Sequence, residues 1–232
     1  MSQQPTHACP IPAQRSTPLF QAVLGEGWGR LAAPVRRHYD LAMGEDQIVA
    51  GVMAEIDHAA WLAPVLWLAG RLEILVPYRG REVPVEVRHT VPLDQPAEQP
   101  SALPFLRTFH FPGHPPAVFR SRMEALGPGE VVEWVGPGFG LVMAVTVRED
   151  GALVYTGRRY VWRLGGVCLP LPGRWVLGQA RIVESAAGPD AGEVLGGPAE
   201  LRLDFDLLHP WWGRSFCYRG RFRIVEGQAP NK

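Results

Sequence analysis

Apolar and polar residues alternate with a period of two along most of this chain. The alternation is clearest between Glu200 and Ile224, where charged residues point one way and leucines and aromatic residues the other, on both sides of a turn. Alternate side chains of a β-strand lie on opposite faces, so this segment predicts a β-hairpin with one apolar and one ionic face. The pattern recurs from Gln47 onward. We therefore expect a mainly β (α+β) protein whose sheet has one apolar side, which encloses an interior that is either filled by its own side chains or hollow.

Turn residues divide the alternating region into segments of strand length. A first strand begins near Gln47, and further strands are expected near 72–78, 82–91, 104–111, 117–125, 130–135, 139–149, 152–164, 174–186, 198–208 and 215–225. Short glycine-containing turns join consecutive segments, which is typical of an antiparallel meander. The prediction is a single meander of about ten strands that forms a curved sheet, a half-barrel or a barrel.

Helical spacing occurs in two regions outside the strands. Apolar residues recur at helical intervals in 19–24, and a second short helical piece is expected to begin at Pro34. Residues 59–70 have the pattern of an apolar helix that carries Trp61 and Trp67. This helix is too apolar for a free surface, so we expect it, like the N-terminal pieces, to cover an open side of the sheet.

The chain is predicted to form one domain. Residues 1–17 are rich in Pro, Gln, Ser and Thr and have no secretory-signal pattern, so we expect a disordered tail there and another at 227–232. Residues 18–226 then form a single β-rich domain, in which the Pro-rich stretch 92–104 is an insertion. The longest apolar run is about half the roughly twenty residues that a membrane-spanning helix needs, so we expect no membrane span.

Composition argues against several classes of function. Lysine plus arginine equals aspartate plus glutamate at 23 each, so there is no basic excess that would gather nucleic-acid phosphates. Cysteines 9, 168 and 217 have no C-x-x-C spacing, which favours reduced thiols in a cytoplasmic protein over a zinc or redox site. The glycine clusters at 25–29 and 136–140 lack the G-x-G-x-x-G spacing of nucleotide-binding turns. We expect no metal, no cofactor and no nucleic-acid partner.

Charged residues on the apolar side of the sheet are the first site candidates. The period of two places Arg107 on the same side as Phe105, Phe109 and Phe111, so Arg107 is expected to point inward. Glu184 ends a later strand on the same side. A buried arginine needs a partner, which either Glu184 or an anionic group of a ligand would supply. The pair is therefore either structural or part of a binding site.

A histidine and a tyrosine complete the candidates. His38 lies on an N-terminal cover, where its imidazole is either a hydrogen-bonded structural group or an acid–base group. Tyr218 carries the one polar tip among the inward residues of the terminal hairpin. The resulting pocket candidates are His38, Trp61, Trp67, Arg107, Phe109, Glu184 and Tyr218.

The outward charges of the terminal hairpin are expected to form a solvated ladder of cross-strand ion pairs. Acidic residues dominate its first strand, and arginines its second. The ladder is predicted to comprise Glu200, Arg202, Asp204 and Asp206 opposite Arg219, Arg221 and Arg223. Exposed pairs of this kind contribute little to stability.

An ordered set of short motifs resembles a known family. It includes Pro34–His38, Val118–Met123, Leu169–Pro172 and Leu203–Asp206. The set is similar to an uncharacterised bacterial domain-of-unknown-function family that often follows a saccharopine-dehydrogenase-like reductase domain on the same chain. The likeness spans roughly residues 19–225. It implies a reductase partner and brings no catalytic residue. Leu106-Arg107 and an expanded loop around Pro92–Pro104 depart from the family's pattern.

Three hypotheses follow. The first is the binding of a small apolar or lipid-like molecule inside the sheet, which predicts a hollow interior. The second is a cofactor-independent enzyme of the isomerase or cyclase type, which requires two of His38, Arg107, Glu184 and Tyr218 within hydrogen-bond reach in one cavity. The third is a scaffold that docks on a reductase, which predicts a large exposed apolar patch in place of a pocket.

Overall fold

The computed structural model describes residues 17–41, 44–91 and 102–225. Almost all of both predicted tails, and most of the predicted insertion at 92–104, lie outside these residues. The strands are β1 (Asp46–His58), β2 (Val83–Thr90), β3 (Leu103–Phe109), β4 (Ala117–Gly127), β5 (Glu130–Val135), β6 (Phe139–Val147), β7 (Leu153–Leu164), β8 (Val167–Leu171), β9 (Gln179–Ala186), β10 (Glu193–Val194), β11 (Gly197–Pro198), β12 (Leu201–His209) and β13 (Gly213–Val225).

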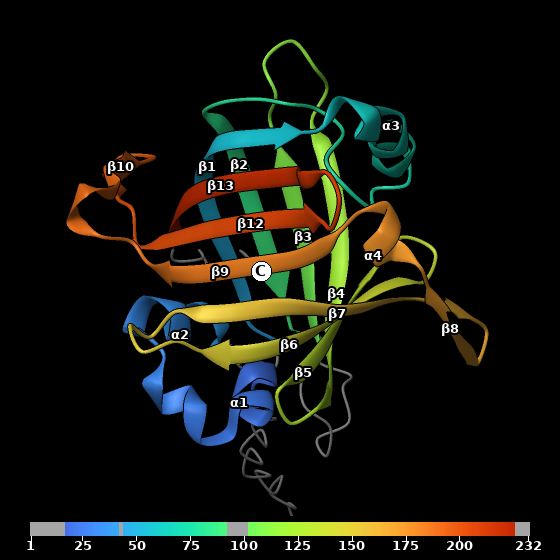
Figure 1. Cartoon of the computed structure of the whole chain (residues 1–232). Coiled ribbons are helices and arrows are strands. Elements are labelled where there is room, and N and C mark those ends of the chain that lie inside the picture. The colour runs from blue at the N-terminus through green and yellow to red at the C-terminus, as the bar shows by residue number, and fades with distance from the viewer. Residues whose placement is uncertain (1–16, 42–43, 92–101, 226–232) are drawn as a thin grey trace, which may run out of the picture.

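Ten of the described strands close into an antiparallel barrel. Their order is β6-β5-β4-β3-β2-β1-β13-β12-β9-β7, and β7 pairs with β6 to complete the ring. Each barrel strand pairs with the next barrel strand along the chain, and β13 pairs back with β1. In Figure 1, β13, β12, β9 and β7 cross the front of the molecule, and β2 to β4 run steeply behind them. The mainly β class and the antiparallel meander are confirmed, and the barrel is fully closed.

Side chains alternate between the interior and the solvent as the period of two predicts. In β2 each residue of the set Val83, Val85, Val87 and His89 is buried, while the residues between them are exposed. Gly51 of β1 shows why one strand position must lack a side chain. A Cβ there would lie 2.3 Å from Cδ1 of Phe222, so the glycine leaves room for that ring inside the barrel.

Short helices close the end of the barrel that lies lower in Figure 1. They are α1 (Leu19–Leu24), the 3-10 turn η1 (Gly25–Arg30) and α2 (Ala33–Tyr39). The Gly129 amide donates to the Val23 carbonyl at 2.8 Å, and the Ala32 amide to the Gly151 carbonyl at 3.0 Å. Phe20 of α1 packs with its ring centroid 4.3 Å from that of Tyr39. The predicted N-terminal helices are confirmed, and their side chains fill this end with a packed core.

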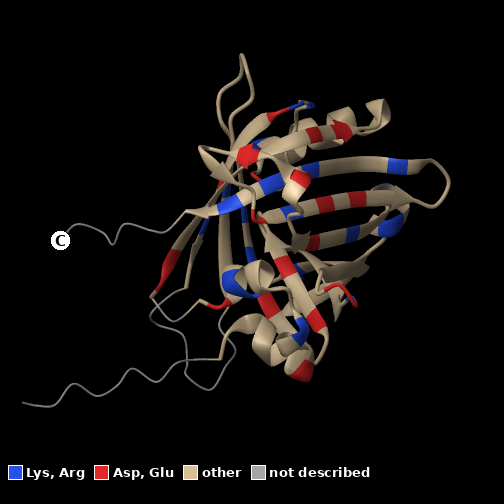
Figure 2. Ribbon diagram, turned by 90° about the vertical axis from the view of Figure 1, so that its left-hand side faces the viewer, with Lys and Arg blue, Asp and Glu red and all other residues tan. Residues whose placement is uncertain are grey.

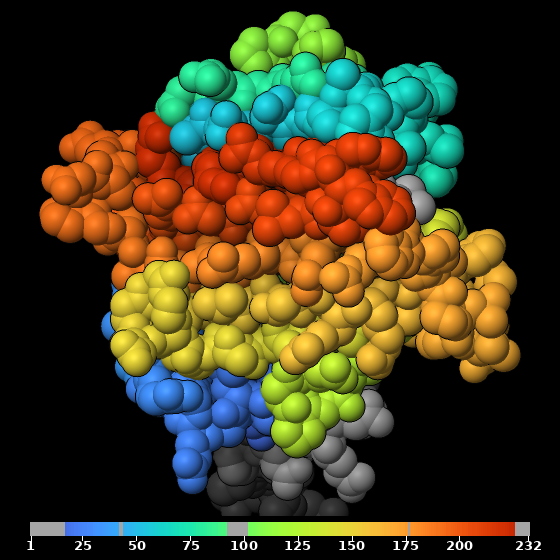
Figure 3. Space-filling model, in the orientation of Figure 1, coloured from blue at the N-terminus to red at the C-terminus, as the bar shows by residue number. Residues whose placement is uncertain are grey.

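The apolar segment near 59–70 lies at the opposite end. It forms the 3-10 turn η2 (Ala60–Leu62) and α3 (Ala63–Arg71), above the right-hand side of the barrel in Figure 1. The short helix α4 (Gly173–Val176) lies at the same side. So does strand β8, which pairs with the end of β7 outside the ring. In the space-filling view, α3 and the β7–β8 hairpin project to the right of the bands formed by the front strands (Figure 3). On the other side, the connection from β9 to β12 holds η3 (Pro189–Ala191) and the small β10–β11 pair.

One strand prediction is wrong, and another begins too early. The segment 72–78 is irregular, because the amides of Leu72 and Ile74 donate to the Ala69 carbonyl and so finish α3 instead of joining a sheet. Glu73 between them has φ 54°, a left-handed conformation that is uncommon for a non-glycine residue and interrupts an extended strand. The predicted strand 174–186 begins only at Gln179, since its first residues form α4. Strand β8 was not predicted.

The outward charges of the terminal hairpin form the expected ladder only in part. Arg219 pairs with Asp206 at 2.7 Å and with Asp204 at 3.1 Å. The register, however, sets Arg202 directly opposite Arg221. Arg202 turns to Asp204 on its own strand, and Arg221 turns away from the hairpin to Glu82 at 2.7 Å. Figure 2 shows the resulting interleaved acidic and basic positions along the outer strands.

Candidate ligand-binding cavity

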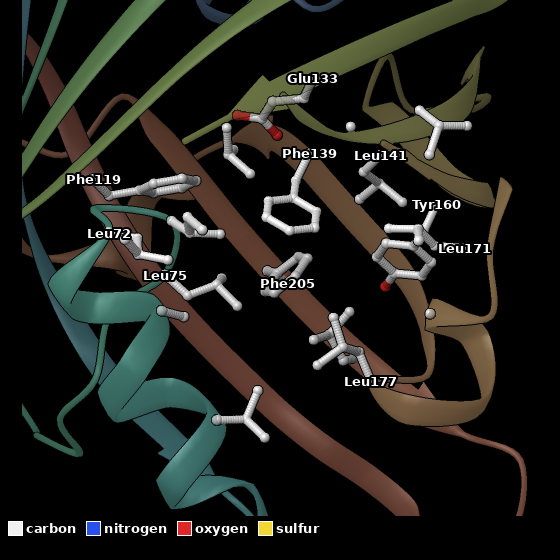
Figure 4. Close-up of a pocket in the computed structure, with 18 of the residues that line it drawn as sticks. Leu72, Leu75, Phe119, Glu133, Phe139, Leu141, Tyr160, Leu171, Leu177 and Phe205 are labelled. Atoms are coloured by element: carbon white, nitrogen blue, oxygen red, sulfur yellow. The ribbon is translucent and has the colours of Figure 1, made fainter. Parts of the chain in front are cut away.

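A cavity of about 430 Å³ lies inside the end of the barrel that α3 covers (Figure 4). Its walls come from α3, the segment after it, β4 to β7, β9, β12, β13 and the stretch around α4. The lining residues are Val65, Leu68, Ala69, Leu72, Ile74, Leu75, Phe119, Glu133, Val135, Phe139, Gly140, Leu141, Tyr160, Val161, Leu171, Pro172, Gly173, Leu177, Ile182, Phe205, Leu207 and Tyr218. Only Glu133 and the two tyrosines bring polar side-chain atoms to it. The barrel is thus filled at its N-terminal plug and hollow at the opposite end.

The wall near α4 depends on a close contact between a tyrosine and a glycine. A Cβ on Gly173 would lie 2.4 Å from Cγ of Tyr160, so only glycine lets the chain pass across the face of that ring. The Tyr160 hydroxyl donates to the Gly178 carbonyl at 2.9 Å. These two contacts hold the α4 stretch against β7 and close that side of the cavity.

The cavity opens to solvent beside α3. Val65, Leu68 and Leu72 line it and are also exposed, so they form its rim. The chain just after α3 is fastened to the barrel wall at Arg120. The Arg120 amide donates to the Glu73 carbonyl at 3.2 Å, and its guanidinium lies 2.6 Å from the Glu73 carboxylate. This attachment fixes the end of the helix that borders the opening.

A buried ion pair forms the polar part of the cavity wall. Oε1 of Glu133 accepts a hydrogen bond from the Ser121 hydroxyl at 2.6 Å and lies 3.1 Å from the Arg107 guanidinium. Arg107 also donates to Ser121 at 2.7 Å, and its guanidinium carbon lies 4.4 Å and 4.8 Å from the ring centroids of Phe105 and Phe119. Burial lowers the pKa of Arg107, but the Glu133 carboxylate and the nearby Tyr218 and Tyr39 hydroxyls together outweigh burial and raise it. Arg107 and Glu133 thus form an ion pair within the wall, in which each charge faces the other.

Tyr218 is the polar group most available to a ligand. Its ring stacks on Phe205, 4.7 Å between centroids, and its side chain lines the cavity. Burial raises the pKa of its phenol, so the hydroxyl stays protonated and can donate. Within the described parts of the chain it forms no hydrogen bond. Oε2 of Glu133 likewise accepts none from a described residue, since both of that side chain's contacts use Oε1.

A second buried polar cluster lies toward the N-terminal plug. Tyr39 donates to the Glu184 carboxylate at 2.5 Å, and Tyr155 donates to the Tyr39 hydroxyl at 2.9 Å. Burial raises the pKa of Glu184 to about 7, although the hydrogen bond from Tyr39 and the charge of Arg107 oppose the shift. Glu184 therefore changes its charge near neutral pH.

Two histidines form a further pair of interior polar groups, and both are neutral near pH 7. The rings of His38 and His89 lie 4.6 Å apart, edge to face. Nδ1 of His38 lies 3.0 Å from the side-chain oxygen of Gln47, whereas neither ring nitrogen of His89 has a hydrogen-bond partner among the described residues. Burial lowers the pKa of His38 to about 4 and that of His89 well below its usual value.

The structure separates the seven residues that the sequence singled out. Tyr218 lines the cavity, and Arg107 stands behind its wall. Glu184 and His38 belong to the interior clusters nearer the plug. The remaining three lie outside the lining: Phe109 is buried in the core, and Trp61 and Trp67 are exposed.

The acid that pairs with Arg107 is Glu133, which corrects the expectation that either Glu184 or an anionic group of a ligand would pair with it. Glu133 lies on β5, two strands from Arg107 on β3, and β4 between them contributes Ser121 to the pair. A signal for Glu133 was present in the sequence. It alternates with Val131 and Val135, so the period of two places it on the apolar side of its strand.

Fold and cavity together define a closed antiparallel β-barrel with a hollow apolar end, an architecture compatible with ligand binding. The chain belongs to the family described as Domain of unknown function (DUF4166), whose model matches residues 31–222. No curated protein and no solved structure matches it. The expected membership of an uncharacterised family is thus confirmed.

Two further features concern metals and membranes. Among the described residues, no group of three or more His, Cys, Asp or Glu side chains is arranged to hold a metal ion. None of the helices in the same part of the chain has both the length and the apolar character that crossing a bilayer demands.

Proposed function

We propose that this protein binds a small apolar or lipid-like molecule in the cavity under α3. The observation that carries the proposal is a space of about 430 Å³ that the barrel's own side chains leave unfilled. Protein interiors are otherwise close-packed, and ligand sites span about 300–1,000 Å³. Almost all of the wall is aliphatic or aromatic, so burial of apolar ligand surface would supply the binding free energy, about 25 cal/mol per Å².

The polar wall favours a ligand with a neutral polar group. The Tyr218 hydroxyl offers a donor, and Oε2 of Glu133 offers an acceptor. The charge of Arg107 is already balanced by Glu133, so a ligand carboxylate would meet no free positive charge there. A hydroxyl group can both donate and accept. A long-chain or cyclic alcohol is therefore the ligand class that this cavity suits best.

The arrangement gives little support to an enzyme. No hydrogen bond joins any two of His38, Arg107, Glu184 and Tyr218 in the described structure, and Tyr218 alone of the four lines the cavity. Proton transfer needs groups within hydrogen-bond reach of a substrate. A reductase partner stays a prediction of the family resemblance.

Binding can be tested by titration with a long-chain alcohol that carries an anthracene group, followed through the probe's fluorescence. We expect saturable binding of one probe per chain. Leu141→Trp places an indole inside the cavity and should weaken binding at least about tenfold. Thr146→Trp adds the same indole to an exposed position of β6 and should change nothing. Absence of saturable binding to the wild type, or equal binding by the Leu141→Trp protein, would overturn the proposal.

The choice of polar group has its own test. Tyr218→Phe removes one hydroxyl and leaves the ring in place. It should weaken binding of the alcohol probe about fivefold to tenfold, the value of one hydrogen bond. The same substitution should leave the affinity for the matching probe without a hydroxyl unchanged. Equal losses for both probes would remove the assignment of Tyr218 while leaving the cavity as the site.

A further inference from the structure

Exposed tryptophans gather at the end of the barrel where the cavity opens. Five of the chain's eight tryptophans lie there, with between 41% and 69% of their surface exposed. They come from η2, α3, α4 and the turn between β12 and β13. We refer to this set as the aromatic end: Trp61, Trp67, Trp175, Trp211 and Trp212.

Ring contacts join three of the four segments of the aromatic end, and α3 with Trp67 follows η2 directly along the chain. The ring centroid of Trp61 lies 4.9 Å from that of Trp212, and that of Trp175 lies 5.1 Å from that of Trp211. His209 lies beneath them, stacked on Trp212 at 4.2 Å, with Nε2 2.9 Å from the Trp175 carbonyl. The turn, η2 and α4 are therefore held together, and their indoles still face solvent.

The aromatic end is continuous with the rim of the cavity. Trp67 precedes Leu68, which lines the cavity and is itself exposed. Trp175 stands between Gly173 and Leu177, two further lining residues. The β7–β8 hairpin adds Val167 and other exposed apolar side chains at the same side of the molecule. Whatever covers the aromatic end also covers the opening of the cavity.

The three segments that supply the tryptophans carry only basic charges, and Glu73, the acid that follows the first of them, is paired with Arg120. Segments 59–72, 164–178 and 208–214 supply all five tryptophans and contain no aspartate or glutamate, but they carry Arg71, Arg174 and Arg214. The guanidinium of Arg71 lies 4.8 Å from the ring centroid of Trp67. The connection from β9 to β12, on the opposite side in Figure 1, reverses the pattern: residues 187–200 hold three acids and no basic residue.

This combination matches the surface of an anionic bilayer. Tryptophan is enriched at the level of the lipid headgroups, where its ring is buried and its N–H stays near water. Arginines beside it are attracted to acidic headgroups, by about 1 kcal/mol each. A docking partner that is a protein would not require the absence of every acid from three separate segments.

We propose that the aromatic end docks on the surface of an anionic lipid bilayer, with the mouth of the cavity facing the lipid. The tryptophans lie among the headgroups, and the three arginines contact acidic lipids. The body of the barrel stays in water, since docking uses only this end. Docking is argued from the exposed residues alone, and the passage of a ligand from the bilayer into the cavity rests on the proposed function.

Flotation with vesicles tests the docking. Vesicles of phosphatidylcholine alone are compared with vesicles in which about a third of the lipid is phosphatidylglycerol. We expect the wild type to bind the anionic vesicles about 100-fold more tightly, from three arginines. A variant with Trp67→Ala, Trp211→Ala and Trp212→Ala should lose at least about tenfold of that affinity. Leu126→Ala is the control. It removes a half-exposed leucine next to the turn between β4 and β5, outside the aromatic end, and should bind like the wild type.

A charge-reversed variant separates the two contributions. Arg71→Glu, Arg174→Glu and Arg214→Glu together should abolish the preference for phosphatidylglycerol, and added salt should do the same to the wild type. All substituted side chains of both variants are exposed, so far-UV circular dichroism should match the wild type.

The results have distinct meanings. A wild type that ignores both kinds of vesicle overturns the docking, as does a tryptophan variant that binds as well as the wild type. Dimerisation that is lost in the tryptophan variant, without vesicle binding, would instead assign the aromatic end to a second copy of this chain. Vesicle binding without probe binding would contradict only the proposed function, and probe binding without vesicle binding would contradict only the docking.

Discussion

Replacing Glu184 by glutamine should stabilise the barrel at alkaline pH and do much less at acidic pH. The partly buried carboxylate accepts a hydrogen bond from Tyr39, and burial raises its pKa to about 7, against 4.5 for a free glutamate. The folded state therefore holds a proton that the unfolded state releases. As pH rises from 4.5 to 7, the folded protein loses stability, because ionisation is more costly inside the barrel.

The magnitude follows from the size of the shift. Each pKa unit corresponds to about 1.4 kcal/mol, so a shift from 4.5 to about 7 amounts to roughly 3 kcal/mol above pH 7. Glu184 is only partly buried, and water reduces this to about 2 kcal/mol. The glutamine side chain of the Glu184→Gln variant cannot ionise and still accepts from the Tyr39 hydroxyl. The variant should thus gain about 2 kcal/mol relative to wild type between about pH 5 and about pH 8.

Urea unfolding of both proteins at the two pH values measures this gain as a double difference. Effects of the substitution that do not depend on pH cancel. Glu86→Gln, at an exposed position of β2, is the matched control and should show no pH-dependent difference. An equal effect of Glu184→Gln at both pH values would refute the assignment of a raised pKa to Glu184.

Three further perturbations test the interior. Glu133→Ala leaves the Arg107 guanidinium without its carboxylate and should cost about 3–5 kcal/mol in urea unfolding; an unchanged midpoint would contradict the buried pair. The lowered pKa of His38 means that stability is lost as pH falls from 6.5 to about 4, and His38→Phe should flatten this part of the urea-derived profile. Gly51→Ala should destabilise the barrel by about 1–3 kcal/mol, since its Cβ meets the Phe222 ring; thermal melting measures this, and an unchanged melting temperature would contradict that contact.

His38 and Glu184 act in opposite directions over much of the same pH range. Protonation of His38 weakens the folded state as pH falls, and ionisation of Glu184 weakens it as pH rises. The contributions of His38 and Glu184 to the stability of the wild type therefore largely cancel between about pH 4.5 and 6.5. Single substitutions are needed to separate the two.

The sequence was sufficient to predict the barrel's strands because each has local signals. In β2 the alternation of Val83, Val85 and Val87 with polar residues identifies both strand and inward face. Segment 72–78 has a similar alternation, yet its first amides complete α3. A hydrogen bond to the end of a neighbouring helix leaves no trace in a period of two, so pattern alone could not distinguish these two segments.

The site depended on relations between strands, which local pattern does not contain. That Arg107 and Glu133 point inward is readable from their neighbours, but their pairing requires the register of β3, β4 and β5. The cavity is likewise not predictable from the local sequence pattern. Phe205 lines the cavity and Phe216, beside it in the same hairpin, is fully buried in the core, although both follow the same alternation.

The exposure of the two tryptophans in the apolar segment also could not be predicted from the local pattern. Trp61 and Trp67 were expected to line the pocket from the covering helix. Helical spacing does give α3 one buried face, at Leu66 and Ala69. Trp67 of α3 and Trp61 of η2 are both exposed. Arg71 is the one charged residue of α3 and lies over Trp67. A single charge in the last turn marks the outer side only weakly, so packing decides which face of the helix turns inward.

The central claim is that the hollow end of the barrel holds a small apolar or lipid-like molecule. The most direct measurement is mass spectrometry of an organic extract of the purified protein, compared with an equal amount of the Leu141→Trp variant. The account predicts about one neutral, lipid-like molecule per wild-type chain, and a clear loss of that molecule from the variant in which an indole fills the cavity. A wild-type extract with no such molecule, or equal recovery from both proteins, would contradict it.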